Sequence, residues 1–182
     1  MKKILTCFVA VAMMAAAGLT SSCSKNQIGA TNSSVTVSAA YRFETTTDFL
    51  KYFDQKLEYY DFISGQIKSI MLTNTTFSLE ASPKLPLTVG MRLTTTLKDG
   101  VTLDQIEALK SFQYISPSLD YGVFINYNNS NAEKTFGKIT IGATPMSLTG
   151  AKIVEGYNAG RFSKSFMKKF DADGNVSDGS WE

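Results

Sequence analysis

The sequence predicts a mostly β protein whose folded part is an antiparallel β-sandwich of about seven to eight strands with one or two short helices. Three observations predict this fold. Apolar and polar residues alternate along several short segments, as they do in strands that bury one face. Asp99-Gly100 directly follows one of these segments and is a strong hairpin signal. All four prolines fall between the strand candidates, as paired strands require: Pro83, Pro86, Pro117 and Pro145.

The strands are expected in the following order. In 35–43 every second residue is apolar or aromatic, which predicts a strand with one buried face. After one helical turn at 48–53, the same alternation predicts further strands around 57–60, 67–72, 77–79, 89–97, 119–127, 139–141 and 162–170. The last segment has three Phe residues that fit both a strand and a helical period. Asp173-Gly174 follows it directly and favours a strand.

The register of 89–97 is the most specific expectation about packing. Its apolar residues share one parity and are expected on the core face: Val89, Met91, Leu93 and Leu97. Thr94 and Thr96 then face solvent. Because side chains alternate along a strand, a shift of one residue would move the whole apolar set into water.

Two segments interrupt the alternation and are expected to be short helices. Thr102 and Gln105 fit a capping box, and Leu103, Ile106 and Leu109 lie on one helical face. The second helix is expected over 152–157.

The first 22 residues have the parts of a secretion signal. Lys2 and Lys3 precede an uncharged, mainly apolar stretch, and small polar residues follow it. Leu19-Thr20-Ser21-Ser22-Cys23 resembles the lipobox of bacterial lipoproteins. That resemblance implies cleavage before Cys23 and attachment of lipid to this cysteine, which anchors the protein to a membrane. We therefore expect a signal peptide at 1–22, the lipidated Cys23 with a flexible tether at 23–34, and one β-sandwich domain at 35–182.

Without the signal, the chain is formally neutral. Two of the 18 Lys and Arg residues lie in the signal, and the remaining 16 balance 16 Asp and Glu. A neutral domain gives no electrostatic reason to expect binding to nucleic acid. Cys7 is removed with the signal and the Cys23 sulfur carries lipid, so no disulfide is expected.

Three segments resemble small lipoproteins of gut Bacteroidetes: TTDFLKYFDQKLEYYD at 46–61, LPLTVGMRLTTTLK at 85–98 and FDADGNV at 170–176. The resemblance implies an envelope location and a β-rich domain, and it carries over no functional residue. Many surface-displayed members have an acidic run after the lipidated cysteine. Ser24-Lys25-Asn26-Gln27 contains no acidic residue. We therefore expect anchoring to the outer membrane, on its periplasmic side.

The residue types present exclude several chemistries. The sequence has no histidine, and with no free cysteine it cannot form a Ser-His-Asp or Cys-His system or the usual zinc sites. Ser165 and Lys168 match S-x-x-K, but the accompanying K-T-G and S-D-N motifs are absent. Residues three apart on a strand also point to opposite faces. We therefore expect no enzyme activity and no cofactor.

A weak calcium candidate lies near the end of the sequence. Asp171, Asp173, Asn175 and Ser177 place oxygen atoms at alternate positions, and Glu182 is the twelfth residue of the series. A calcium loop of the EF-hand type needs Gly at its sixth position, where this sequence has Val176. A polar hairpin built on Asp-Gly turns is the favoured interpretation.

Two larger sets of residues could contribute to binding. The acidic residues Glu44, Asp48, Asp54, Glu58 and Asp61 alternate with basic ones and are expected to form a solvated, mixed-charge surface. The aromatic residues could stack on sugars or line a partner groove, although most of them fit core positions: Tyr52, Tyr59, Tyr60, Tyr121, Tyr127, Tyr157 and Trp181.

Three functions remain open. The leading hypothesis is a non-catalytic envelope module that binds a protein or glycan partner. The alternatives are a carrier of a small apolar ligand or lipid, and a pilin-like assembly subunit. An enclosed apolar cavity would favour the carrier, and an incomplete sheet edge would favour the pilin. A closed core with aromatic surface patches would favour the binding module.

Overall fold

A computed structural model of the chain describes residues 35–128 and 132–181. They belong to one compact unit, Ser33–Glu182. The predicted mostly β fold is confirmed, since strands make up 49% of the described residues and helices 14%. The predicted signal, Cys23 and the tether lie outside the described residues, as does Glu182 of the calcium candidate. Within the described part of the chain, no helix is long and apolar enough to cross a membrane.

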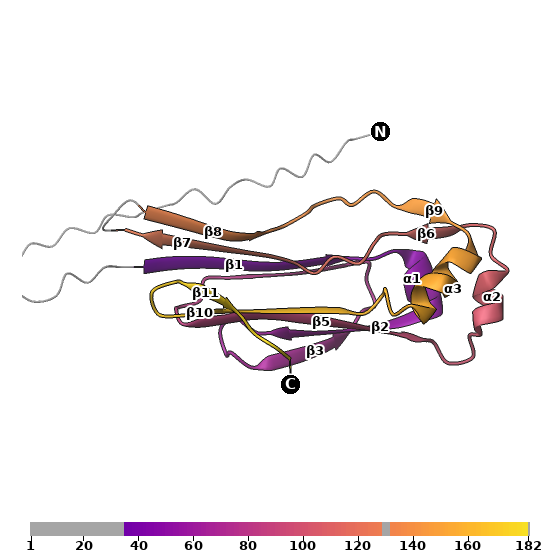
Figure 1. Cartoon of the computed structure of the whole chain (residues 1–182), viewed down its shortest axis with the longest axis horizontal. Helices are drawn as coiled ribbons and strands as arrows, with labels where there is room; N and C mark the ends of the chain where they lie inside the picture. Colours follow the sequence, from indigo (N-terminus) through magenta and orange to yellow (C-terminus); the bar gives the residue numbers. More distant parts are fainter. Residues whose placement is uncertain (1–34, 129–131, 182) are drawn as a thin grey trace, which may run out of the picture. The chain divides into compact units, whose positions relative to one another are not determined.

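Two antiparallel sheets form the body of the domain (Figure 1). The four-stranded sheet has the order β4 (Thr76–Ala81), β1 (Val35–Glu44), β7 (Asp120–Tyr127) and β8 (Ala132–Lys138). The five-stranded sheet has the order β11 (Val176–Asp178), β10 (Lys164–Phe170), β5 (Leu87–Leu97), β2 (Phe53–Tyr60) and β3 (Ile67–Met71).

The main core lies between the inner faces of these sheets. Its residues from β1 and β7 pack against residues from β2, β5 and β10. Three aromatic pairs cross from one sheet to the other, with ring centroids 4.8–5.1 Å apart: Tyr59–Phe77, Tyr121–Phe166 and Phe136–Phe170. The fold is therefore the predicted β-sandwich, because each sheet buries one face against the other.

Tyr41 connects the two sheets by its hydroxyl group. The side chain extends from β1 and is 1% exposed. Its hydroxyl accepts the backbone N–H of Gly90 at 2.9 Å and donates to the carbonyl of Tyr60 at 3.1 Å. Gly90 and Tyr60 lie one position beyond the last pair of the β2–β5 ladder, Tyr59 and Met91. The hydroxyl thus lies between an N–H donor and a carbonyl acceptor that would otherwise pair directly with each other. Burial raises the pKa of Tyr41 despite the hydrogen bond from Gly90.

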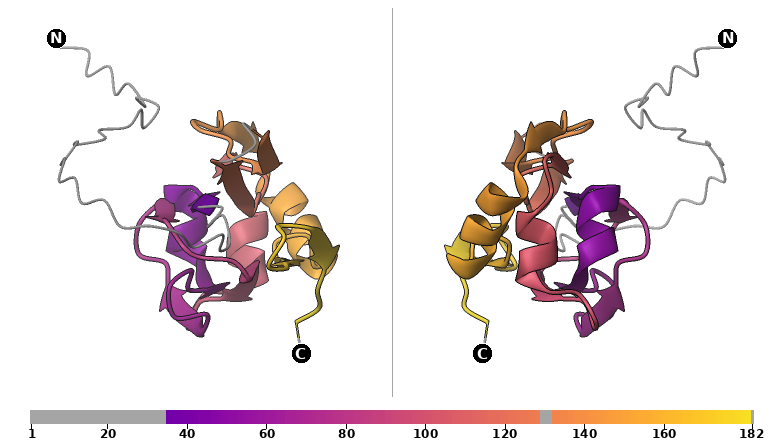
Figure 2. Two further views of the ribbon diagram at one scale, coloured as in Figure 1. Left: turned by 90° about the vertical axis from the view of Figure 1, so that its left-hand side faces the viewer. Right: turned by 90° about the vertical axis from the view of Figure 1, so that its right-hand side faces the viewer.

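A second core closes one end of the sandwich. It is formed by α1 (Thr47–Tyr52), α2 (Leu103–Glu107), α3 (Gly150–Asn158) and the small sheet of β6 (Phe112–Tyr114) and β9 (Met146–Leu148) (Figures 1 and 2). Phe49 of α1 is fully buried there, and its ring contacts those of Phe112 and Phe162 at 5.3 and 4.9 Å. The predicted capping box of Thr102 and Gln105 is present at the start of α2.

The strand expected at 139–141 is the main error in the predicted elements. The structure places β8 at Ala132–Lys138 and leaves 139–141 outside any strand. The N–H groups of Thr140 and Gly142 donate to the carboxylates of Asp120 and Glu44, so they are not available to a strand ladder. β8 itself is exposed along most of its length, which removes the alternation that predicts a strand.

The number of elements also exceeds the prediction. The described residues form eleven strands, against the seven to eight expected, and three helices, against one or two. The additional strands β6, β9 and β11 have three residues each. Three residues are too few to show an alternation of apolar and polar side chains. These strands are defined by their pairing, β6 with β9 and β11 with β10.

The register predicted for β5 is confirmed. Val89, Met91 and Leu93 are 0–1% exposed, and Leu97 is half-buried against the second core. Thr96 is exposed and Thr94 is half-buried. Thr95 joins the inner face, where its hydroxyl donates to the carbonyl of Phe162 at 2.8 Å.

This register predicts unequal costs for two neighbouring substitutions. Leu93→Ala should lower the free energy of unfolding by about 2–5 kcal/mol, because it leaves a cavity in the main core. Thr94→Ala should cost under about 1 kcal/mol, because the side chain is on the outer face of the sheet and leaves no cavity in the core. Urea melts of the two variants measure the difference. Equal costs would show that β5 is not held in this register.

Candidate functional site

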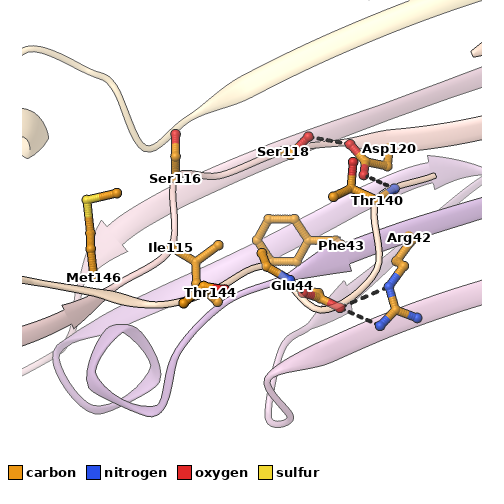
Figure 3. Close-up of a pocket in the computed structure, with 11 residues that line it drawn as sticks. Arg42, Phe43, Glu44, Ile115, Ser116, Ser118, Asp120, Thr140, Thr144 and Met146 are labelled. Carbon is orange, nitrogen blue, oxygen red and sulfur yellow. Dashed lines mark hydrogen bonds and ion pairs between the residues drawn. The ribbon is translucent and has the colours of Figure 1, made fainter. Parts of the chain in front are cut away.

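A half-open pocket of about 350 Å³ lies where β1 ends and β7 begins, and we call it the Arg42 pocket (Figure 3). Its walls come from the ends of these two strands and from the loops that precede β7 and β9. Its lining includes the side chains of Arg42, Glu44, Asp120, Thr140, Thr144 and Met146. Residues from three distant parts of the sequence therefore form one site.

Glu44 holds one wall of the pocket in place. Its carboxylate accepts Nε of Arg42 at 3.0 Å and pairs with a second guanidinium nitrogen of the same residue. It also accepts the backbone N–H groups of Gly142 and Ala143 at 3.2 and 2.9 Å. Arg42 and Glu44 are two residues apart on β1 and therefore project from the same, outer face. Their pair fixes the loop before β9 against the end of β1.

Asp120 has the same role on the neighbouring strand. Asp120 lies opposite Arg42 in the β1–β7 pairing. Its carboxylate accepts the backbone N–H of Thr140 at 2.7 Å and the hydroxyl of Ser118. Two carboxylates thus hold three N–H groups of one loop, and the pocket is formed before any ligand arrives.

These contacts decide which chemistry the carboxylates can perform. Partial burial raises the pKa of Glu44, but the hydrogen bonds from Arg42, Ala143 and Gly142 outweigh this effect and leave the pKa below its usual value. Glu44 is therefore ionised at neutral pH and acts as a hydrogen-bond acceptor. A general acid needs the opposite shift, towards the working pH. The lowered pKa therefore does not favour Glu44 as a general acid.

The remaining surface of the pocket combines apolar and hydroxyl groups. Phe43 is 1% exposed, whereas Met146 at the rim is 53% exposed. Ser116, Thr140 and Thr144 add hydroxyl groups that form no side-chain hydrogen bond within the described structure. Ligand pockets usually measure about 300–1,000 Å³, so this one can hold a small ligand or the end of a larger partner.

A second pocket, of about 510 Å³, lies between the loop that joins β2 to β3 and the loop that joins β4 to β5. Its lining includes Phe62, Ile63, Leu85 and one charged side chain, Lys84. Ile63 is 73% exposed. This pocket has no carboxylate in its lining and only one charged group, so we regard the Arg42 pocket as the better defined site.

The predicted acidic surface does not form a single site. Glu44 lines the Arg42 pocket, whereas Asp48 accepts the backbone N–H of Gln113 and connects α1 to β6. Glu58 on β2 pairs with Lys56 of the same strand and with Arg92 of β5. Asp61 accepts Lys68 and the amide of Ser64 in the next loop. Asp54 lies on β2.

The other two sequence candidates gain no support as sites. Ser165 and Lys168 lie on β10, and Lys168 pairs with Asp178 of β11. Asp171 accepts the backbone N–H groups of Asp173 and Asn175, at 2.9 and 2.8 Å, and so stabilises a turn. In the part of the chain that the structure describes, no three His, Cys, Asp or Glu residues are grouped to hold a metal ion.

The aromatic candidates divide into two groups. Five of them pack against the two cores: Tyr52, Tyr59, Tyr121, Tyr127 and Tyr157. Tyr60 and Trp181 instead meet each other, with ring centroids 5.2 Å apart. Gly90 lies beneath both rings, since a Cβ at that position would come within 3.2 Å of Tyr60 and 3.3 Å of Trp181.

Sequence reasoning did not identify Arg42, Asp120 or the loop before β9 as parts of a site. The sequence feature that could have indicated this site is the pair of opposite charges at Arg42 and Glu44, two residues apart on the outer face of a strand. Their loop partners are 98 and 99 residues further along the chain from Glu44, beyond the reach of any local pattern.

The contacts of Glu44 predict a local effect on hydrogen exchange. Glu44→Ala should accelerate exchange of the Gly142 and Ala143 amides by about 10- to 100-fold, since hydrogen bonds to charged groups contribute about 1.5–3 kcal/mol. The same protection should be lost in the wild type on acidification. The lowered pKa means that the contribution is complete above the ordinary Glu pKa and disappears as pH falls through the lower, folded-state value.

Glu155→Ala is the matched control, because that carboxylate lies on α3, is 50% exposed and pairs with Lys152 and Arg161, away from the loop before β9. This control should leave both amides unchanged. Unaltered exchange in Glu44→Ala would show that the carboxylate does not hold the loop.

The chain was compared with models of protein families, with curated proteins and with solved structures, and none of the three comparisons found a match.

Proposed function

We propose that this chain is a lipid-anchored lipoprotein of the cell envelope that acts as a non-catalytic binding module for a protein or glycan partner. The observation that carries the binding role is the Arg42 pocket. Its walls are fixed by Glu44 and Asp120, and its hydroxyl groups and Met146 remain available to a ligand. Both carboxylates are engaged as acceptors, which favours binding over catalysis.

The position of the pocket fits a protein anchored at Cys23. β1 begins at Val35, the first described residue, and ends at Glu44 in the pocket, so the ten residues of this strand separate Val35 from the pocket. At about 3.3 Å per residue, this distance is roughly 30 Å. If the eleven residues between Cys23 and Val35 form the tether expected from the sequence, they would span about 20 Å. A lipid at Cys23 would thus place the membrane near the start of β1 and leave the pocket open to a partner.

The two alternative functions find less support. A lipid carrier needs an enclosed apolar cavity, whereas the Arg42 pocket is half-open and has three charged side chains in its lining, Arg42, Glu44 and Asp120. A pilin-like subunit completed by a donor strand needs an incomplete core. In the described structure the centre of the main core is covered by both sheets, and Leu57, Val89 and Ile125 are 0% exposed there.

The anchor is tested by Cys23→Ala. This variant should accumulate as uncleaved precursor or be released in soluble form, because no thiol remains to accept the lipid. Membrane fractionation and mass spectrometry of the N-terminal peptide measure the outcome. A Cys23→Ala protein that is fully processed and still membrane-bound would contradict the lipoprotein assignment.

The pocket is tested by site-specific photo-crosslinking of the full chain in cells. A photoreactive residue at Thr144 should give a discrete protein or glycan adduct, because this side chain lines the pocket and is exposed. Thr135 on β8 is the matched control, an exposed threonine outside the pocket. If Thr144 gives no adduct, or if both positions give the same adducts in similar yield, the Arg42 pocket is not the binding site.

A further inference from the structure

The outer face of the five-stranded sheet carries a row of one aliphatic and two aromatic side chains that crosses several strands. Ile67 on β3 lies opposite Tyr60 on β2, and Trp181 lies over Gly90 on β5 beside Tyr60. We call these three side chains, Ile67, Tyr60 and Trp181, the Trp181 row. Ile67 is 50% exposed, and Tyr60 and Trp181 are partly exposed. With strands about 4.8 Å apart, the row extends roughly 10 Å across the sheet, further than a single sugar ring.

Trp181 is held in one orientation. Its indole Nε1 donates to the carbonyl of Phe166 at 2.9 Å. The guanidinium carbon of Arg92 lies 4.8 Å from the ring centroid, a cation–π distance. The absence of a side chain at Gly90 lets the ring approach the sheet. A fixed aromatic side chain loses little further entropy when a ligand stacks on it.

A row of polar side chains runs beside the Trp181 row. Ser69, Glu58 and Arg92 lie opposite one another on β3, β2 and β5. Glu58 accepts Nε of Arg92 at 2.7 Å and Nζ of Lys56 at 3.2 Å. Arg92 has five N–H donors, of which this contact uses one. The remaining donors and the exposed hydroxyl of Ser69 are available to a ligand.

The charges of this surface indicate which ligand class fits. The Glu58 carboxylate is neutralised by its basic neighbours, and these hydrogen bonds from Arg92 and Lys56 hold its pKa below the usual value. Glu58, Arg92 and Lys56 together leave a net charge of only +1, so the surface offers mainly apolar stacking and hydrogen bonds. Neutral sugars combine an apolar ring face with peripheral hydroxyl groups and match both rows.

The geometry points to a second binding site, on the Trp181 row, for a neutral linear glycan. The sugar rings stack along Tyr60 and Trp181, and their hydroxyl groups bond to Arg92, Glu58 and Ser69. This site is on a different sheet from the Arg42 pocket and does not depend on the lipid anchor. Failure of either earlier proposal therefore leaves this one standing, and the reverse also holds.

The fluorescence of Trp181 provides a direct test, because it is the only tryptophan of the chain. The purified full chain is titrated with a panel of neutral polysaccharides: β-glucan, xylan, mannan and galactan. Polygalacturonate serves as the acidic counterpart. At least one neutral polymer should shift Trp181 emission and retard the protein in an affinity gel, whereas polygalacturonate should have a smaller effect.

Variants locate the binding. Tyr60→Ala and Ile67→Ala keep the reporter and should each weaken binding, Tyr60→Ala by roughly tenfold, about the loss of one aromatic contact. Trp181→Ala, followed by affinity gel, should weaken it at least as much. Val35→Ala is the matched control, since Val35 is an exposed apolar residue at the start of a strand in the other sheet. Circular dichroism melts establish that each variant is folded.

Three results would overturn this assignment. The first is that no neutral polymer binds the folded wild type. The second is that Tyr60→Ala and Ile67→Ala bind as well as the wild type. The third is that polygalacturonate binds more tightly than every neutral polymer, which would identify an anionic ligand.

Discussion

The hydroxyl of Tyr41 is the contact on which the rest of the structure most depends. It joins Gly90 to Tyr60 and so connects the four-stranded sheet to the point where β2 and β5 separate. Removing the hydroxyl would leave a buried donor and acceptor without their shared partner, and such losses cost about 1–3 kcal/mol per group. The same contact positions the backbone beneath Tyr60 and Trp181. One buried hydrogen-bonded group thus supports both the packing of the sandwich and the surface on its outer side.

The Arg42 pocket shows how charged side chains are used on the outer face of β1, next to Tyr41. Glu44 and Asp120 bind backbone N–H groups of a loop that has no core of its own, since Ile141 and Met146 are 52% and 53% exposed. Charge-assisted hydrogen bonds are stronger than neutral ones and position such a loop without hydrophobic burial. The loop remains polar and accessible, which is what a binding site for a partner requires.

The sequence predicted those elements whose own residues carry the pattern. The alternation in β1 and β5 predicted the sandwich and its inner face, and Thr102 with Gln105 predicted the start of α2. It missed the first half of β2 because Gln55 occupies a core position between Phe53 and Leu57. The Gln55 amide is fully buried and makes no hydrogen bond within the described residues. Such a group costs about 1–3 kcal/mol, and no pattern of hydrophobicity predicts it.

The candidate sites were less predictable than the fold, because they depend on pairing between distant segments. β1 nevertheless connects them. Its odd residues face the core and include Tyr41, whereas its even residues face outward and include Arg42 and Glu44. A slip of one residue in β1 would exchange these two sets, burying the charges of the pocket and exposing the tyrosine that joins the sheets. The hydrophobic pattern that fixes the register of β1 therefore also determines that the Arg42 pocket and the Trp181 row form together.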